Sequence, residues 1–287
     1  MIKRVVNYLS LIFLPDRLYI LIKYYRRTGK KLNLNPPRTF NEKLQWLKLY
    51  YRNNLWTRLV DKYEVKNYVS EKIGNDYVIP TFGVWNSFSE IDFEKLPEQF
   101  VLKCTHDSGS VVICHNKSMF NKKEAKALLS RALKRNFYYI SREWPYKNVK
   151  PRIIAESFLQ SDDSEGLTDY KFFCFNGIPL YCQVITERNI DKRIDFFDMN
   201  WKHQDIRGLS LPFANMSDNQ IRKPISFEQM KRNAQILSQG IPFVRIDFYE
   251  ANNRPYFGEY TFFPAGGFGL FDPEPLNDLL GDLIKIV

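Results

Sequence analysis

Hydrophobic residues recur at two different spacings along the chain, and these spacings separate predicted helices from predicted strands. Between residues 41 and 68 apolar side chains return every three to four positions, as at Leu44, Leu47 and Tyr51, which predicts helices. The TFNE sequence from Thr39 to Glu42 is typical of a capping box where the first of these helices begins. Further helices are predicted over residues 122–136 and 227–238.

Short apolar runs bounded by turn residues predict strands in the rest of the chain. Two runs enclose a small polar turn from Asp107 to Ser110, and another two meet at Asn176-Gly177, a typical hairpin turn. The predicted strands cover residues 79–84, 100–104, 111–114, 152–159, 170–175, 179–186, 243–250 and 255–263. Antiparallel strands mixed with helices, without an internal repeat, predict an α+β fold.

The last predicted hairpin carries paired acidic residues. If an odd number of residues forms its loop, Asp247 lies opposite Glu259 and Arg245 lies opposite Thr261, all on one face. Two directly opposed carboxylates destabilise a strand pair unless a positive group lies between them. Mg²⁺, held by one or two carboxylates and by substrate phosphates, is the natural candidate. The alternative is a solvent-exposed face on which arginines screen the two acids.

Lys103 interrupts an apolar strand, and lysine is rarely buried without a partner, so we expect it to point into a cleft. The turn that follows offers backbone N–H groups and hydroxyls at Ser108, Gly109 and Ser110, which suits it to covering phosphates. No GxxxxGK[ST] sequence occurs, so this turn is not a P-loop. An ordinary hairpin with an edge-strand lysine is the alternative interpretation.

Composition places the chain among packed globular proteins, because 44% of its 287 residues are hydrophobic. The net charge is +10, and residues 1–31 alone hold eight cations and one acid, a net charge of +7. This segment is predicted either to dock on the body as helix or to lie on an anionic membrane as a basic amphipathic anchor. Its apolar stretches are shorter than the ~20 residues that a membrane span requires.

Two further classes of partner are not expected. The basic charge does not recur with aromatic residues along later segments, so no nucleic acid is expected. Four cysteines show neither CxxC pairing nor His-linked zinc spacing, so they are interpreted as small buried hydrophobes in a reducing, cytoplasmic setting.

Three motifs, in order, resemble those of the ATP-grasp ligases. They are Asp61-Lys62-Tyr63, then Val101-Leu102-Lys103 with Ser108-Gly109-Ser110, then Arg245-Ile246-Asp247 with Glu259-Tyr260-Thr261. The last pair is similar to the R-x-D and E-x-N motifs of D-alanine–D-alanine ligase, with a threonine in place of the asparagine. The resemblance implies two α+β lobes that clasp ATP and Mg²⁺.

The same resemblance implies a role for each matching residue. Lys62 and Lys103 would contact phosphate, Arg245 would stabilise the reacting carboxyl, and Asp247, Glu259 and Thr261 would bind magnesium. Residues 153–159, with Glu156 and Phe158, resemble the hinge strand that hydrogen-bonds adenine, and Asp169 stands where the family keeps a ribose-binding acid. Asp169 and Lys171 would serve either the nucleotide or the acceptor, and the alternative for Lys171 is a structural pair with the acid. The implied segments are 1–60 (helical), 61–150 (first lobe) and 151–287 (second lobe).

The closer resemblance is to the TupA-like ATP-grasp family, named for a teichuronopeptide biosynthesis protein. Its features are similar to Phe40–Lys43, Lys103–Ser110, Glu143–Tyr146, Asp169–Phe172 and Gly258–Gly267. This resemblance implies an ATP-dependent carboxylate–amine ligase of surface-polysaccharide biosynthesis that works through an acyl phosphate. Its substrates would be a uronic-acid carboxylate, on a polysaccharide or lipid-linked glycan precursor, and an amino acid or amine.

In that reaction Gly266 and Gly267 would let the acceptor approach the backbone closely. Residues 1–31 would suit an enzyme that visits lipid-linked glycans at the cytoplasmic face of a bacterial membrane. A glycosyltransferase that uses a nucleotide sugar is the main alternative. A polysaccharide kinase and a non-catalytic nucleotide-binding subunit are the others.

Overall fold

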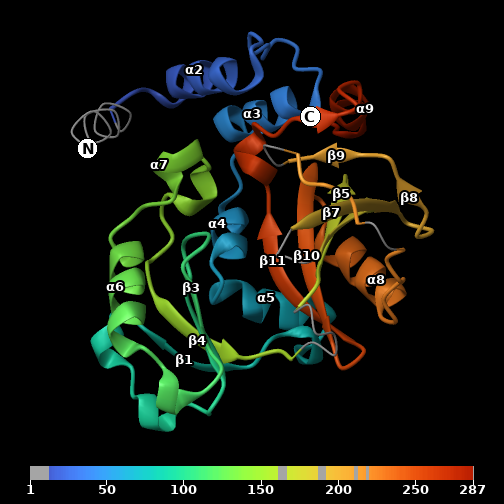
Figure 1. The fold of residues 1–287 in the computed structure, drawn as a ribbon. Coiled ribbons are helices and arrows are strands. Elements are labelled where there is room, and N and C mark those ends of the chain that lie inside the picture. Colours follow the sequence, from blue (N-terminus) through green and yellow to red (C-terminus); the bar gives the residue numbers. More distant parts are fainter. Residues whose placement is uncertain (1–12, 161–166, 187–191, 210–212, 218–219, 287) are drawn as a thin grey trace.

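Two antiparallel sheets lie side by side in the structure, a computed structural model that describes residues 13–160, 167–186, 192–209, 213–217 and 220–286 (Figure 1). The smaller sheet has four strands in the order β1-β4-β2-β3. These strands are β1 (Thr81–Trp85), β2 (Phe100–Cys104), β3 (Val111–Cys114) and β4 (Ile153–Ser157). All of its strand pairs are antiparallel.

The larger sheet has six strands in the order β11-β10-β5-β6-β7-β8. They are β5 (Asp169–Phe175), β6 (Ile178–Thr186), β7 (Arg193–Asp198), β8 (His203–Gln204), β10 (Phe243–Ala251) and β11 (Arg254–Thr261). A separate two-stranded pair joins β9 (Arg207–Gly208) to β12 (Phe271–Asp272). The predicted α+β fold is therefore confirmed, although the patterns along residues 193–198 and 203–208 gave no expectation of strands.

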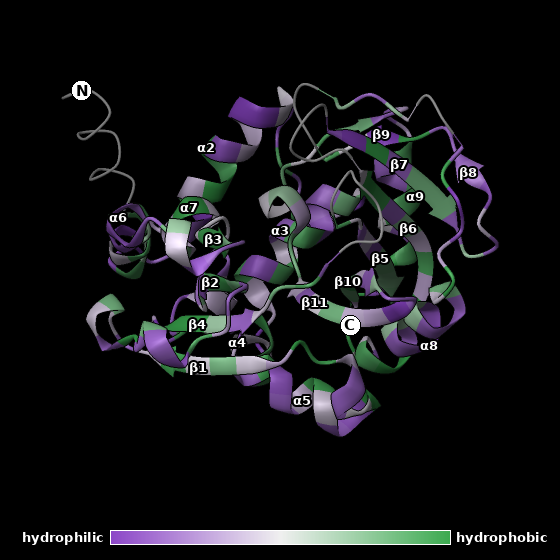
Figure 2. Ribbon diagram, turned by 60° about the horizontal axis from the view of Figure 1, so that its bottom comes forward, coloured by the Kyte–Doolittle hydropathy of each residue, from purple (hydrophilic) through white to green (hydrophobic). Residues whose placement is uncertain are grey.

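Helices cover the sheets and connect them. The α-helices are α2 (Asp16–Thr28), α3 (Phe40–Tyr50), α4 (Asn54–Val60), α5 (Glu64–Ile73), α6 (Lys122–Leu133), α7 (Tyr138–Ser141), α8 (Phe227–Leu237) and α9 (Leu276–Leu283). Short 3-10 helices are η1 (Asn75–Tyr77), η2 (Phe88–Glu90), η3 (Phe93–Lys95), η4 (Lys117–Met119), η5 (Trp144–Tyr146) and η6 (Pro264–Gly267). Hydrophilic residues run along α2, α5 and α8 (Figure 2), as on helices with one face in water.

Each sheet has its own hydrophobic core. The larger core joins the six-stranded sheet to α3, α4, α5, α8 and α9, whereas the smaller core joins β2 and β4 to α6. Helix α5, placed by the sequence in the first lobe, therefore packs with the larger sheet. Strand β4, placed in the second lobe, pairs with β1 and β2 of the smaller one. The predicted segment boundaries at 60/61 and 150/151 thus do not coincide with the division between the two sheets. Which sheet a strand joins depends on pairing between strands that are distant in the chain.

Helix α3 begins with the capping box that the TFNE sequence predicts. The Thr39 side chain accepts from the Glu42 N–H at 3.2 Å, and the Glu42 carboxylate accepts from the Thr39 N–H at 3.1 Å. From the same helix Asn41 donates to the Gly269 carbonyl at 2.6 Å. These contacts tie the start of α3 to the glycine-rich segment that follows β11.

Helix α2 is docked on the body, as one of the two interpretations of residues 1–31 expected. Tyr19, Ile20 and Tyr24 are buried, and the Tyr19 hydroxyl donates to the Ile140 carbonyl of α7 at 2.5 Å. Residues 1–12 lie outside the described residues. Within the described part of the chain, none of the helices combines the length and apolar character needed to cross a bilayer.

In the β10–β11 hairpin Asp247 pairs with Glu259, as predicted, but the loop does not have the odd number of residues on which that prediction depended. Its turn has only two residues, Asn252 and Asn253, with φ of 52° and 58°, which is typical of a tight hairpin turn. A bulge at Gly258 supplies the odd residue, since Asp247 pairs with Glu259 while the next residue pairs with Phe257. A Cβ at Gly258 would lie 3.1 Å from the Asp247 carbonyl oxygen, so glycine suits this position.

Candidate functional site

One cavity of about 500 Å³ is lined by residues from both halves of the molecule. The smaller half contributes Ser108 from the turn between β2 and β3. The larger sheet contributes Arg245, Glu259 and Thr261 from β10 and β11. Helices α2 and α7 and the η6 segment complete the wall. The cavity thus brings the predicted phosphate-covering turn and the predicted metal-binding hairpin to one site.

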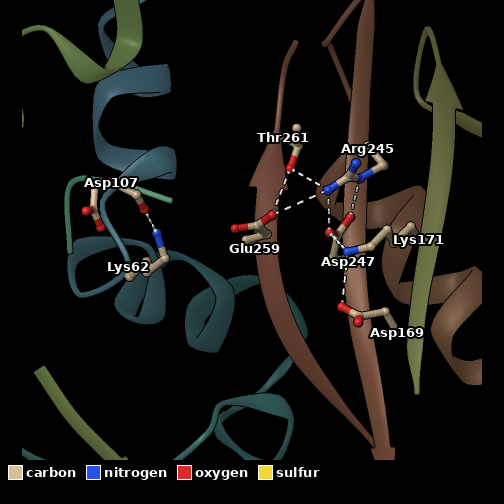
Figure 3. Close-up of polar contacts among 8 residues, drawn as sticks. All are labelled: Lys62, Asp107, Asp169, Lys171, Arg245, Asp247, Glu259 and Thr261. Atoms are coloured by element: carbon tan, nitrogen blue, oxygen red, sulfur yellow. Dashed lines mark hydrogen bonds and ion pairs between the residues drawn. The ribbon is translucent and has the colours of Figure 1, made fainter. Parts of the chain in front are cut away.

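The polar side chains of the larger sheet lie in rows across three neighbouring strands. Asp247 of β10 pairs with Lys171 of β5 on one side and with Glu259 of β11 on the other. One row along, Arg245 pairs with Thr261. Because side chains two residues apart on a strand share a face, these five groups gather on the same side of the sheet (Figure 3).

These residues form a continuous ion-pair network. The Arg245 guanidinium donates to both oxygens of Asp247, at 2.7 Å to Oδ1 and 2.6 Å to Oδ2, and it also reaches Thr261 Oγ1 at 3.0 Å. Lys171 Nζ lies 2.5 Å from Asp247 and 3.1 Å from Asp169. The structure therefore places Asp169 and Lys171 in the network that holds Asp247, behind the residues that line the cavity.

Asp247 is almost fully buried, at 1% exposure, and is held ionised by its neighbours. Burial alone would raise the pKa of this carboxyl, but Arg245 and Lys171 outweigh it, so the pKa lies below its usual value. The same carboxylate raises the pKa of Arg245 against the effect of burial. Asp247 and Arg245 thus hold each other in the charged form.

The donor set fits a magnesium–nucleotide complex. Mg²⁺ prefers oxygen ligands and is usually held by one or two carboxylates together with phosphates and water. The Glu259 side chain is 36% exposed and lines the cavity, and its Oε1 accepts from Thr261 at 3.2 Å. Asp247 is buried, lies outside the cavity lining and already accepts three hydrogen bonds from Arg245 and Lys171, so Glu259 is the carboxylate that the hairpin presents to the cavity. Among the described residues no cluster of three or more His, Cys, Asp or Glu side chains forms a metal site by itself.

Lys62 lies beside the predicted phosphate-covering turn. Its side-chain ammonium donates to the Asp107 carbonyl (Figure 3). Its backbone N–H donates to the Thr105 carbonyl at 3.0 Å. Ser110 Oγ donates to the Asp107 carboxylate at 2.5 Å, and Gly109 has a φ of +95° with open space around it. Burial lowers the pKa of Lys62, while Glu259 and Asp107 partly offset that effect. The turn is therefore preorganised, with a cation at its base.

Lys103 and Glu156 meet on adjacent strands of the smaller sheet. Their charged groups lie 2.5 Å apart, and a second lysine, Lys66 of α5, lies 2.6 Å from the same carboxylate. Burial would raise the pKa of Glu156, but the two lysines lower it overall. Lys66 was missed in the sequence because only the tertiary structure brings α5 next to Glu156 of β4. Its position four residues after Lys62 was the one available signal.

The predicted site residues that line the cavity are Ser108, Arg245, Glu259, Thr261 and Gly266, and the others lie outside its lining. Phe158 follows β4 and packs edge-on against the His115 ring at 4.9 Å. Gly267 lies against α3, where a Cβ would come within 2.7 Å of Gln45 Nε2. Gly266 does line the cavity, but a Cβ there would lie 2.9 Å from Ser141 Cβ. Packing alone therefore accounts for both glycines, and their role in acceptor approach stays a prediction.

The cavity also contains charged residues to which the sequence assigned no role. Lys23 and Arg27 of α2 line it, as does Glu143, the first residue of the EWPY sequence. Burial raises the pKa of the Glu143 carboxyl, which accepts from Ser141 Oγ at 2.5 Å. The concentration of positive charge in residues 1–31 was the signal for the two α2 residues, but docking between distant segments decided where they point.

The fold and the site define an ATP-grasp protein. Two α+β halves enclose a cavity that has a phosphate-covering turn on one side and an Arg-Asp-Glu hairpin on the other. The sequence profile of the TupA-like ATPgrasp family matches residues 42–285, and the chain belongs to that family. The resemblance seen in the sequence is thereby confirmed.

Comparisons with individual proteins are more distant. No curated protein matches the chain. Among solved structures it is similar to the D-alanine–D-alanine ligase of Bacillus anthracis complexed with ATP, with 13% identity over 80% of this chain and a TM-score of 0.42. The enzyme of the same name from Helicobacter pylori gives 15% identity over 87% of this chain and 71% of that one, with a TM-score of 0.43.

A third structure is the ATP-grasp ligase PsnB complexed with its minimal precursor, Mg and ADP, at 11% identity over 77% of this chain, with a TM-score of 0.39. The chain spans 58% of the Bacillus enzyme and 57% of PsnB. Because all three TM-scores are below 0.5, these likenesses add nothing to what the family shows.

Proposed function

We propose that the protein is an ATP-dependent carboxylate–amine ligase that acts on a surface-polysaccharide precursor. The observation that carries this proposal is the shared cavity, in which Ser108 of the phosphate-covering turn and Arg245 and Glu259 of the hairpin line one space. Such a space suits a triphosphate that is covered from one half and held with Mg²⁺ from the other. Its γ-phosphate would then lie next to Arg245.

In the proposed reaction a substrate carboxylate oxygen attacks the γ-phosphorus of ATP, and ADP leaves. The acyl phosphate formed is attacked by an amine, the amide bond forms, and phosphate leaves. Lys62 and Lys103 offset phosphate charge, and bound Mg²⁺, held by Glu259 with Asp247 and Thr261, would offset the rest. Arg245 is positioned to stabilise the oxyanion that develops when the amine attacks. The sugar acid, the amine and a place at the inner face of a membrane are parts of this proposal.

The first test is a thermal-shift comparison of purified protein with Mg-ATP and with UDP-sugars. A ligand that binds only the folded state raises the melting temperature, so Mg-ATP is expected to raise it and UDP-sugars are not. The reverse result would favour a glycosyltransferase and contradict the ligase.

Variants then test the assigned residues. Lys103→Ala and Glu259→Ala are each expected to abolish ADP formation in the presence of carboxylate and amine pairs. Glu94→Ala, at an exposed position of η3, is the matched control and should keep it. Circular dichroism shows whether each variant is folded, and full ADP formation in both folded variants would defeat the assignment.

A further inference from the structure

The cavity extends beyond the β10–β11 residues to a second end that the proposed chemistry does not use. There its wall consists of Lys23 and Arg27 of α2, Ile140 of α7, and Gly266 and Phe268 in and after η6. We call these five residues the α2 end. No role for them follows from the phosphate-covering turn or from the hairpin.

Helix α2 is anchored on the segment around α7 by contacts of its first turn. Asp16 lies 3.2 Å from the guanidinium of Arg142 and also accepts from the Tyr138 hydroxyl. The same guanidinium stacks 4.5 Å from the centre of the Tyr19 ring, and Arg142 itself is 1% exposed. These contacts bury one face of α2 against α7, so the helix is a built part of the cavity wall.

The two cations at the α2 end have no carboxylate partner. Within the described residues, Lys23 Nζ contacts only the Ile140 carbonyl, the Tyr19 hydroxyl at 3.2 Å, and the rings of Tyr19 and Phe268, the latter at 5.0 Å. Arg27, one helical turn further on, has no acid within ion-pair distance in the same part of the chain. Burial, and then Arg27, lower the pKa of Lys23 to about 8, against the opposing effect of Glu143.

A pair of like charges four residues apart destabilises a helix, so this arrangement has a cost without a partner. The opposite wall offers one carboxyl, Glu143, which accepts from Ser141 Oγ and whose pKa is raised by burial. Lys48 Nζ donates to the carbonyls of Gly266 and Ser141, at 2.7 and 2.8 Å, and lies 4.3 Å from the centre of the Phe268 ring. These carbonyl oxygens are therefore already bound to a cation and do not repel an anion.

We propose that the α2 end binds an anionic group, a carboxylate or a phosphate, on the substrate that the ligase joins, with Lys23 and Arg27 as its ligands. This inference rests on the proposed function. The group is distinct from the carboxylate that reacts beside Arg245, because Lys23 and Arg27 belong to α2 whereas Arg245 belongs to β10. Charge-assisted hydrogen bonds to two cations would fix the substrate and orient its reacting end towards the nucleotide.

The test compares two double variants of α2 that remove the same charge. Lys23→Ala/Arg27→Ala removes the cavity cations, and Arg17→Ala/Arg26→Ala removes two exposed cations that do not line the cavity. Alanine is a good helix former, so both should keep the helix. Glucuronate, glucose 1-phosphate and neutral glucose are titrated calorimetrically into each protein, with and without saturating Mg²⁺ and AMP-PNP.

We expect the wild type to bind at least one of the two anionic sugars and not glucose, and the responding sugar identifies the group as carboxylate or phosphate. The cavity variant should bind that sugar on the order of 10- to 100-fold more weakly, because two charged hydrogen bonds are lost. The Arg17→Ala/Arg26→Ala control should bind it as the wild type does. AMP-PNP should bind all three proteins equally.

Several outcomes would overturn the inference. Binding of neither anion by the wild type, or equal weakening in both variants, contradicts a site at the α2 end. So does an equal loss of co-sedimentation with phosphatidylglycerol vesicles in both variants, since Lys23 and Arg27 would then face lipid. Failure of AMP-PNP to bind the wild type contradicts the proposed function instead, and the titrations without nucleotide still judge the α2 end.

Discussion

The two ends of the cavity hold their charges in opposite ways. At the β10–β11 end every cation has an acidic partner, and Asp247 alone contacts both Arg245 and Lys171. At the α2 end Lys23 and Arg27 have no acid within ion-pair distance among the described residues. Lys23 contacts a carbonyl and two aromatic rings instead, and Arg27 lowers its pKa further. The first arrangement stabilises a fixed site, whereas the second leaves positive charge available to a ligand.

The largest loss of stability is expected when the ion-pair network at the β10–β11 end is broken. Asp247→Asn leaves Arg245 and Lys171 without their shared charge in a buried position, which should lower the free energy of unfolding by about 3–5 kcal/mol. Urea denaturation measures this change. The same substitution at Asp272, whose pair with Arg207 is exposed, is the matched control and should cost about 0–1 kcal/mol. Equal small effects would show that the buried network is not stabilising.

A pH series tests whether Lys48, which contacts Gly266 and Phe268 of the α2 end, loses its charge in the folded protein above pH 7. Burial lowers the pKa of Lys48 to about 7 in the folded protein, against a usual value of 10.5. Between these values the unfolded chain binds more protons than the folded one, so stability should rise with pH. The free energy of unfolding of the wild type minus that of Lys48→Met should therefore increase by up to about 1.4 kcal/mol per pH unit above pH 7.

That prediction is checked by urea unfolding of both proteins at intervals from pH 6 to 9. Glu143, whose pKa is raised by burial, lies close to Lys48 and is present in both proteins. Only the slope of the difference is informative, because Lys48→Met also leaves two carbonyls without a donor. A difference that is constant above pH 7 would mean that a partner keeps Lys48 charged.

The smallest change in stability is expected at the α2 end. Arg27→Ala should change the free energy of unfolding by less than about 0.5 kcal/mol, because the removed repulsion with Lys23 is offset by the lost attraction of a cation to the last turn of α2. Differential scanning calorimetry of closely matched samples can resolve such a change. A clear loss of stability would show instead that Arg27 has a structural partner.

Local features of this fold could be predicted from the sequence, and distant pairings could not. The capping box at Thr39 and the pairing of Asp247 with Glu259 depend on residues close in the chain. By contrast, the contacts of Lys66 with Glu156 and of Lys171 with Asp247 join elements that are neighbours only after the sheets form. Hydrophobic spacing cannot reveal such neighbours, because it reports the face of each element and not what that face meets.

The hairpin shows both sides of this limit. The expected register depended on an odd number of loop residues, and the odd residue proved to be the bulge at Gly258. A single glycine in a strand pattern is a known indication of a bulge, so this signal was present in the sequence. The orientation of Lys23 and Arg27 had no comparable signal. The sequence pattern of a basic helix face is the same whether that face contacts solvent, lipid or a cavity.

The docking of α2 has a consequence for how the protein is made. Tyr19 bonds to Ile140, which is 121 residues further along the chain, so this contact cannot form until about half of the chain has left the ribosome. Contacts of such long sequence separation form late in folding, because a large loop must close first. During synthesis the face of α2 that meets α7 is therefore exposed, and its final position is set only when α7 has formed. Completion of the cavity wall is thus a late step in the maturation of this protein.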